Sequence, residues 1–155
     1  MTEQSTPHHP PTASQTTARV LASFLAFVGI LEMLRTGVSS LSEPVGMSFF
    51  GYPAHFMTGA VHLVAGLIGI WCATRAHLAA PYLTGLATLM VVWIAAGLAL
   101  GGRPNDVFTR DGTLLVLHGV VALASVLGIV LDSRRRPAPG PTHEVPGVHP
   151  PEIVH

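Results

Sequence analysis

The sequence predicts an all-α fold: an integral membrane four-helix bundle with disordered N- and C-terminal tails. Composition is the first observation, because 49% of the 155 residues are hydrophobic and only 10% are charged, whereas soluble domains have about 25% charged residues. The second observation is four separate apolar segments, each long enough to cross the ~30 Å hydrocarbon core of a bilayer. We expect spans at residues 18–38, 56–74, 82–100 and 113–131, within one transmembrane domain of residues 18–132.

The two ends of the chain lack residues that build a core. Residues 1–17 are rich in Ser, Thr, Pro, Gln and His, and residues 133–155 are rich in proline, so both tails are predicted to be disordered. The formal net charge is zero and every basic residue is an arginine. No basic surface therefore indicates nucleic acid as a partner. The single cysteine, Cys72, excludes an internal disulfide and a multi-cysteine metal site.

The first span, residues 18–38, contains an acidic residue. Its uninterrupted apolar part, Val20 to Leu31, is shorter than the ~20 residues that a membrane crossing needs. The helix must therefore include Glu32 and reach at least Arg35. These two residues are spaced i, i+3, so we expect them to pair, with the arginine reaching toward the interface. A structural pair and a functional acid are both open interpretations of Glu32.

The second span, residues 56–74, combines one histidine with small residues. At helical spacing these fall on a single face, because residues three and four apart are neighbours on a helix. The face consists of Gly59, His62, Gly66, Gly69 and Ala73. Small residues allow close approach of helices in membranes, so this face is predicted to pack against another span.

The third and fourth spans carry similar faces. Pro81 is expected to lie in the short turn before the third span, residues 82–100. The predicted packing face of that span contains Gly85, Thr88, Val92 and Ala95 or Ala96. On the fourth span, residues 113–131, His118, Ala122 and Ser125 share one face. Ala122 and Ser125 are predicted helix-packing residues, as are the small residues of the second span.

Helix geometry predicts a polar layer across the bundle. The second and fourth spans start from the same side of the membrane, and His62 and His118 each lie about six residues, or roughly 9 Å, inside their starts. The first span ends on that side, and Glu32 lies about six residues before its end. The predicted polar layer therefore contains Glu32, His62 and His118, with His55 just above it.

Three roles are open for this layer. Interhelical hydrogen bonding is the structural one. Proton handling or ligand binding is the second, because imidazole titrates near neutral pH. The third is cofactor binding, in which His62 and His118 serve as ligands of a metal ion or as axial ligands of b-type haem. No nucleophile elbow, phosphate loop or zinc-protease helix occurs, so the sequence predicts no enzyme.

One set of residues begins in the second span and continues, beyond the apolar third span, into the following loop and the fourth span. In order, the set is His62, Gly66 and Gly69, which form the pattern H-x3-G-x2-G, followed by Asn105, Asp111 and the Leu117–His118 pair. With this set the chain resembles a family of small bacterial four-helix membrane proteins that is catalogued only as a domain of unknown function. The resemblance covers about residues 20–131. It implies a four-span bundle without an established activity.

The sequence thus predicts a multi-pass protein of the bacterial inner membrane whose main partner is the lipid bilayer. We expect a structural or accessory membrane component that associates with itself or with other membrane proteins. The alternatives are an electron-transfer subunit that binds haem b through His62 and His118, and a proton-coupled transporter or channel that uses Glu32 and the histidines. Five arginines lie on the side of the termini and three on the other side, which favours cytoplasmic termini.

Overall fold

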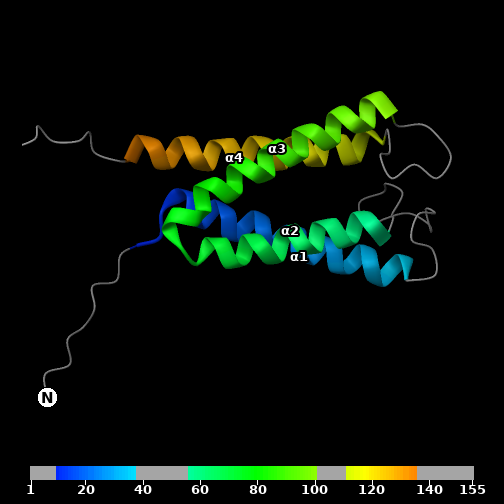
Figure 1. Cartoon of the computed structure of the whole chain (residues 1–155), viewed down its shortest axis with the longest axis horizontal. Helices are drawn as coiled ribbons and strands as arrows, with labels where there is room; N and C mark the ends of the chain where they lie inside the picture. The colour runs from blue at the N-terminus through cyan, green and yellow to red at the C-terminus, as the bar shows by residue number, and fades with distance from the viewer. Residues whose placement is uncertain (1–9, 38–55, 101–110, 136–155) are drawn as a thin grey trace, which may run out of the picture.

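The protein is a bundle of four antiparallel α-helices, and the predicted fold class is confirmed. The structure, a computed structural model, describes residues 10–37, 56–100 and 111–135. Its helices are α1 (Ala13–Thr36), α2 (Phe56–Ala73), α3 (Ala76–Leu100) and α4 (Gly112–Arg135). All four are long and apolar enough to cross a membrane. The start of α1 and the end of α4 lie at the same end of the bundle (Figure 1).

Helix α1 begins at Ala13, five residues before the predicted start, so the prediction of a disordered tail up to residue 17 is wrong for residues 13–17. The side chain of Thr12 accepts a hydrogen bond from the backbone N–H of Gln15, and the Gln15 side chain accepts one from the Thr12 N–H. This reciprocal capping box stabilises a helix start. Helix α4 likewise extends beyond the predicted domain end, to Arg135. Residues 1–9 and 136–155 lie outside the described residues.

Pro81 lies inside α3 and not in the turn before it, so that prediction is wrong. The turn consists of Thr74 and Arg75, and α3 begins at Ala76. A proline within a helix removes one hydrogen bond to the carbonyl four residues earlier. Here that carbonyl belongs to His77, in the first turn of α3. Near a helix end, water or headgroups can satisfy this carbonyl, so the proline is tolerated.

Helices α1 and α2 form the most tightly packed pair, because glycines bring their backbones into contact. A Cβ atom added to Gly29 would lie 2.6 Å from the carbonyl oxygen of Gly59, and one added to Gly66 would lie 2.7 Å from that of Ala22. Ordinary contacts of a Cβ atom begin at about 3.4 Å. No side chain beyond hydrogen therefore fits at these positions without moving a helix.

The second pair, α3 and α4, joins the first through two apolar clusters. The first cluster lies toward the end of the bundle at which α1 begins and consists of Ala18, Ala73, Ala79 and Leu83. The second lies nearer the middle of the bundle and consists of Leu25, Leu86, Met90 and Val121. Polar bonds add to both. The Tyr82 hydroxyl donates to the carbonyl of Ala65 at 3.1 Å, and the Ser14 hydroxyl donates to that of Gly128 at 3.4 Å. These contacts hold α1 against α4 and α2 against α3.

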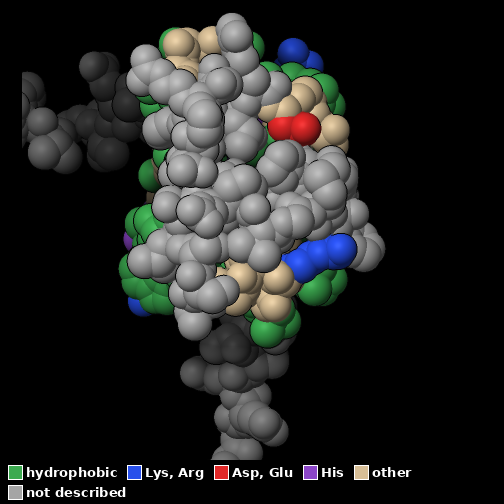
Figure 2. All heavy atoms as spheres, turned by 90° about the vertical axis from the view of Figure 1, so that its right-hand side faces the viewer, with side chains coloured by type: hydrophobic (Ala, Val, Ile, Leu, Met, Phe, Trp, Pro, Cys, Tyr) green, Lys and Arg blue, Asp and Glu red, His purple; other side chains and the backbone are tan. Residues whose placement is uncertain are grey.

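Large apolar side chains cover the outside of the bundle, as lipid requires. Leu34, Val116 and Leu123 are 77%, 67% and 70% exposed, which would be costly in water but not in hydrocarbon. Figure 2 looks onto the end of the bundle where α2 and α4 begin. It shows charged side chains at the edge of that face and apolar side chains along the flanks of the bundle.

The predicted packing face of α3 also points outward, which corrects that prediction. Gly85, Thr88 and Val92 are exposed, and a Cβ atom added to Gly85 would meet nothing within 4 Å. The buried face of α3 is built from larger side chains, including Leu86 and Met90. These larger side chains fill the space between α3 and the other helices, whereas the contact between α1 and α2 needs small residues.

Candidate functional site

Three ionisable side chains from three helices meet in the interior of the bundle. Glu32 of α1, His62 of α2 and His118 of α4 are only 3%, 3% and 2% exposed. Below they are called the Glu–His–His cluster. Each lies on the inward face of its helix, while Leu34, Val64 and Val120 on the same helices face outward. A carboxylate and two imidazoles are thereby kept away from lipid.

The cluster is joined by two contacts in series. The Nδ1 atom of His62 lies 2.9 Å from the carboxylate oxygen Oε2 of Glu32. The opposite ring nitrogen of His62, Nε2, lies 3.4 Å from Nε2 of His118. A carboxylate is the acceptor for an imidazole N–H, so His62 donates through Nδ1. One hydrogen then lies between the two Nε2 atoms, and either ring can carry it.

The backbone explains why the three side chains reach the same depth. His62 is about two turns into α2 and His118 about two turns into α4, and both helices start at one end of the bundle. Glu32 precedes the last turn of α1, which finishes at that end. Helix rise is fixed at 1.5 Å per residue, so similar offsets from the helix ends give similar depths.

Glu32 has a different neighbour from the one that its sequence spacing suggested. Arg35 is exposed, whereas Glu32 is buried and contacts His62. The close packing at Gly59 explains this choice, because a Cβ atom added to Gly59 would lie 2.9 Å from Cβ of Glu32. Glu32 therefore packs directly against Gly59 of α2. Because Gly59 lies one helical turn before His62, the Glu32 carboxylate is within reach of the His62 ring. His55 lies outside the described residues.

Trp93 of α3 completes the surroundings of the cluster. Its ring lies edge-on to that of His118, with centroids 6.2 Å apart, while the centroids of His62 and His118 are 5.7 Å apart. All four helices thus contribute a side chain at this level. The sequence pattern did not link Trp93 to a histidine. Its position within α3, away from the interface that tryptophan usually occupies, is the signal that could have identified it.

Among the described residues, Nδ1 of His118 and the hydroxyl oxygen of Thr58 have no hydrogen-bond partner. Thr58 lies one turn before His62 on the buried face of α2. The Nδ1 atom of His118 is consequently the end of the cluster at which a further proton can be accepted.

All of the predicted helix-packing residues of α2 and α4 are buried except Ala122, which is half-buried. Gly59, Gly66, Gly69 and Ala73 are all buried on α2. On α4 Ser125 is buried and its hydroxyl donates to the carbonyl of Val121 at 2.8 Å, while Ala122 is half-buried. The buried face of α4 thus runs through Val121 instead of Ala122.

The geometry does not suit bis-histidine haem. Two axial imidazole nitrogens lie on opposite sides of the iron, so they are separated by roughly 4 Å, twice a metal–nitrogen bond of ~2.0 Å. His62 and His118 instead face each other directly with their Nε2 atoms 3.4 Å apart, and Trp93 lies against the His118 ring. In the parts of the chain that the structure describes, no three His, Cys, Asp or Glu side chains converge on a metal position.

Comparisons with known proteins do not add an assignment. No family model, no curated protein and no solved structure matches the chain. The resemblance to the four-helix membrane family therefore stays a prediction.

Proposed function

We propose that this protein is a proton-coupled membrane protein, of the transporter or channel type, in which the Glu–His–His cluster takes up and releases protons. The observation that carries the proposal is the continuous series of contacts from Glu32 through His62 to His118 inside an apolar bundle. Ionisable groups within membrane spans are rare, and they commonly mark proton pathways.

The contacts define how many protons the cluster can hold. With Glu32 ionised, His62 donates through Nδ1 and accepts through Nε2 from the N–H of His118. A further proton enters at Nδ1 of His118, and the imidazolium then shares its Nε2 hydrogen with His62. That state has no net charge, because the imidazolium balances the carboxylate. Burial in hydrocarbon favours this neutral cluster over the cluster with one proton fewer or one proton more, because each of those has a net charge.

Loss or gain of one more proton disturbs this balance. Loss leaves a net negative cluster, and gain gives two imidazolium rings, each with a hydrogen on the facing Nε2 atom. Rings with centroids 5.7 Å apart then repel by roughly 3 kcal/mol at an effective dielectric constant near 20. The 3.4 Å contact between His62 and His118 cannot persist in that state.

The position of this contact supports coupling to helix movement. Among the described residues, α2 and α4 make no close backbone contact; they are diagonal in the bundle. His62 and His118 therefore bridge two helices that are otherwise separated. Glycines lock α2 to α1, and α4 contacts α1 through Ser14–Gly128 and Leu25–Val121. Breaking the bridge therefore frees the start of α4 to move away from α2 while the rest of α4 stays against α1, which is the kind of two-state element that a proton can bias.

We also propose a membrane and an orientation for the protein. Arg19, Arg75, Arg134 and Arg135 lie toward the end of the bundle at which α1 begins. Arginines accumulate on the cytoplasmic side of membrane proteins. We therefore propose the bacterial inner membrane, with the termini in the cytoplasm and the Glu–His–His cluster nearer the opposite side.

Proton flux into lipid vesicles tests the proposal. The purified chain is reconstituted with a pH-sensitive dye inside, and a pH gradient is imposed together with a potassium diffusion potential. Glu32→Gln, His62→Asn and His118→Asn should each lower the flux about tenfold or more, as loss of a positioned proton carrier does. His77→Asn is the matched control, because His77 is exposed at the far end of the bundle.

Circular dichroism of each variant distinguishes lost function from lost fold. Variants that stay helical and lose flux support the proposal. Helical variants with unchanged flux would overturn it, as would a control that loses as much flux as the cluster variants.

A structural or accessory role is the second candidate, and the glycine contacts between α1 and α2 favour it. In that case Glu32, His62 and His118 serve only as interhelical hydrogen bonds, each worth roughly 0.6–2 kcal/mol in a membrane. The protein would then associate with itself or with other membrane proteins and would have no enzymatic activity. This role predicts that the three variants lose stability but that wild-type vesicles show no flux above protein-free vesicles.

A further inference from the structure

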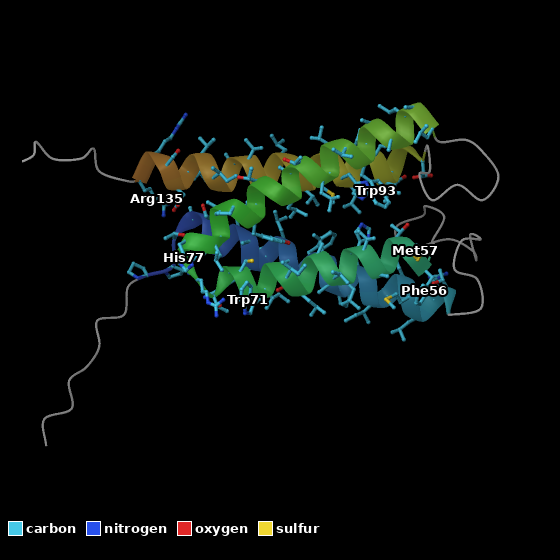
Figure 3. All side chains as sticks on the ribbon, in the orientation of Figure 1. Phe56, Met57, Trp71, His77, Trp93 and Arg135 are labelled. Atoms are coloured by element: carbon cyan, nitrogen blue, oxygen red, sulfur yellow. The ribbon has the colours of Figure 1, made fainter. Side chains whose placement is uncertain are left out.

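The two ends of the bundle lie at different distances from the Glu–His–His cluster. His62 and His118 are both in the second turn of their helices, so about 9 Å of helix separates the cluster from the end at which α2 and α4 begin. This end is called the near end below, and the opposite one the far end. Met57 and Trp93 lie toward the near end and His77 lies at the far end (Figure 3). The near end is therefore the shorter way out of the bundle for a proton.

Between the cluster and the near end, α2 contributes a buried hydroxyl. Thr58 lies one turn before His62 on the buried face of α2 and is only 3% exposed. Its oxygen Oγ1 has no hydrogen-bond partner in the part of the chain that the structure describes, and neither has Nδ1 of His118. Buried polar groups normally have a partner. Both atoms are consequently available to a transient partner, such as a proton in transit.

The other buried hydroxyls that the structure describes are engaged. Thr36, one turn after Glu32 on α1, is also 3% exposed, and its hydroxyl donates to the carbonyl of Glu32 at 2.9 Å. The hydroxyls of Ser14 and Ser125 donate to carbonyls as well. A hydroxyl hydrogen bonded to a backbone carbonyl is not free to move on to another acceptor. Among these side chains Thr58 is therefore the one suited to pass protons.

On the far side of the cluster the interior is apolar. Val121 follows His118 by one turn on α4, and Met90 precedes Trp93 by one turn on α3. Both belong to one packed group whose members are 2–3% exposed: Leu25, Leu86, Met90 and Val121. This group is called the apolar layer below. Such side chains have no hydrogen-bonding groups with which to pass a proton, and apolar constrictions exclude water. The apolar layer therefore separates the cluster from the far end.

We propose that the Glu–His–His cluster exchanges protons with the near end only, and that Thr58 passes them between water at that end and Nδ1 of His118. A hydroxyl has one hydrogen to donate and two lone pairs that accept. When a hydronium ion gives a proton to Oγ1 of Thr58, the hydroxyl releases its own hydrogen to Nδ1. Water, an unchanged threonine and an imidazolium result. This role of Thr58 rests on the proton-coupled function proposed above, whose orientation makes the near end the side away from the cytoplasm.

Proton flux in the same vesicle assay tests Thr58. Thr58→Val replaces the hydroxyl with a methyl group of similar size and should lower the flux about tenfold, as loss of a positioned proton carrier does. Thr58→Ser keeps a hydroxyl and should restore most of the flux. Thr36→Val is the matched control, because it removes an equally buried hydroxyl that is already bonded, and it should leave the flux unchanged. Circular dichroism checks that each variant is folded.

The fluorescence of Trp93 tests the side of access, because its ring lies against that of His118. Trp71→Phe leaves Trp93 as the single tryptophan. Vesicles with outward and with inward termini are separated on an affinity tag added to the N-terminus, and acid is then added outside. The fluorescence should change about tenfold faster in vesicles with inward termini, since only their near end, with its positioned proton carrier, meets the acid.

The two measurements have separate contradicting outcomes. Wild-type flux in Thr58→Val would overturn the role of Thr58, and so would equal losses in Thr58→Val and Thr36→Val. Fluorescence that changes at the same rate in both orientations, or in neither, would overturn the one-sided access. A wild-type protein without flux would instead overturn the proton-coupled function, and the fluorescence rates would still decide from which end the cluster is reached.

Discussion

Replacing Gly66 with alanine should strain the contact between α1 and α2. The new methyl carbon would lie 2.7 Å from the carbonyl oxygen of Ala22 and 2.8 Å from Cα of Ala26. Both neighbours are backbone atoms, which cannot rotate away as a side chain can. Ordinary contact begins at about 3.4 Å, and the backbone nitrogen of Ala26 would lie closer still, so the two helices must separate by more than about 0.7 Å. Overpacking of this kind costs about 1–3 kcal/mol.

Gly85→Ala is the matched control for this variant. It makes the same chemical change in a helix of the same bundle, where the added Cβ atom meets nothing within 4 Å. Both variants gain the helix propensity of alanine over glycine, up to about 1 kcal/mol. The difference between them therefore isolates the strain, and it should be about 1–3 kcal/mol.

The assay is reversible unfolding in mixed micelles of detergent and sodium dodecyl sulfate, followed by circular dichroism. Gly85→Ala should unfold at the wild-type denaturant fraction or slightly above it, and Gly66→Ala should unfold clearly below it. Equal midpoints for the two variants would refute the close glycine contact between α1 and α2.

Three further predictions follow from individual side chains. In a Trp71→Phe background, fluorescence of the remaining Trp93 should change as the pH is lowered, because protonation of both rings breaks the 3.4 Å contact between His62 and His118 and moves the His118 ring that lies against Trp93. Tyr82→Phe removes a hydroxyl that bonds a carbonyl of α2 and should lower the free energy of unfolding by about 0.5–1.5 kcal/mol in the same micelle assay. Thr12→Ala removes the N-cap of α1 and should cost about 1 kcal/mol, with faster amide hydrogen exchange confined to the first turn of α1.

Each of these has an outcome that contradicts it. Adding His118→Gln to the Trp71→Phe background should remove the pH response; a response that persists would assign it to another group. An unchanged midpoint for Tyr82→Phe would mean that its hydroxyl contributes nothing to stability. Faster exchange throughout α1 in Thr12→Ala would indicate loss of packing and not of a cap.

The depth of the polar groups could be predicted from the sequence, whereas their partners could not. Residue counting along helices of fixed rise was sufficient to place Glu32, His62 and His118 at one level. The neighbour of Glu32 depends on how α1 and α2 are rotated against each other. That rotation is set by the glycine contacts between them, so the nearby Arg35 was a wrong choice. The approach of Trp93 to His118 likewise depends on tertiary packing.

The number and order of the helices could be predicted, whereas some of their boundaries could not. Four apolar segments were sufficient for the number and order of the helices. The early start of α1 was missed because the capping box of Thr12 and Gln15 adjoins a proline-rich segment that resembles a tail. The position of Pro81 inside α3 was missed because a proline usually ends a helix, whereas here it removes only the hydrogen bond to the carbonyl of His77, near the start of α3. On α3 the small residues Gly85 and Thr88 face outward because bulkier side chains fill the interior.

In the proposed cluster, His62 and His118 share one hydrogen between their Nε2 atoms while His62 donates to Glu32. Solid-state nuclear magnetic resonance of ¹⁵N-histidine-labelled protein in lipid bilayers measures this directly, through the ¹⁵N–¹⁵N coupling across the hydrogen bond. We predict a coupling between the Nε2 atoms of these two rings near neutral pH, absent in His118→Asn and lost at low pH when both rings are protonated. Two histidine signals without mutual coupling at any pH, in the folded protein, would contradict the account.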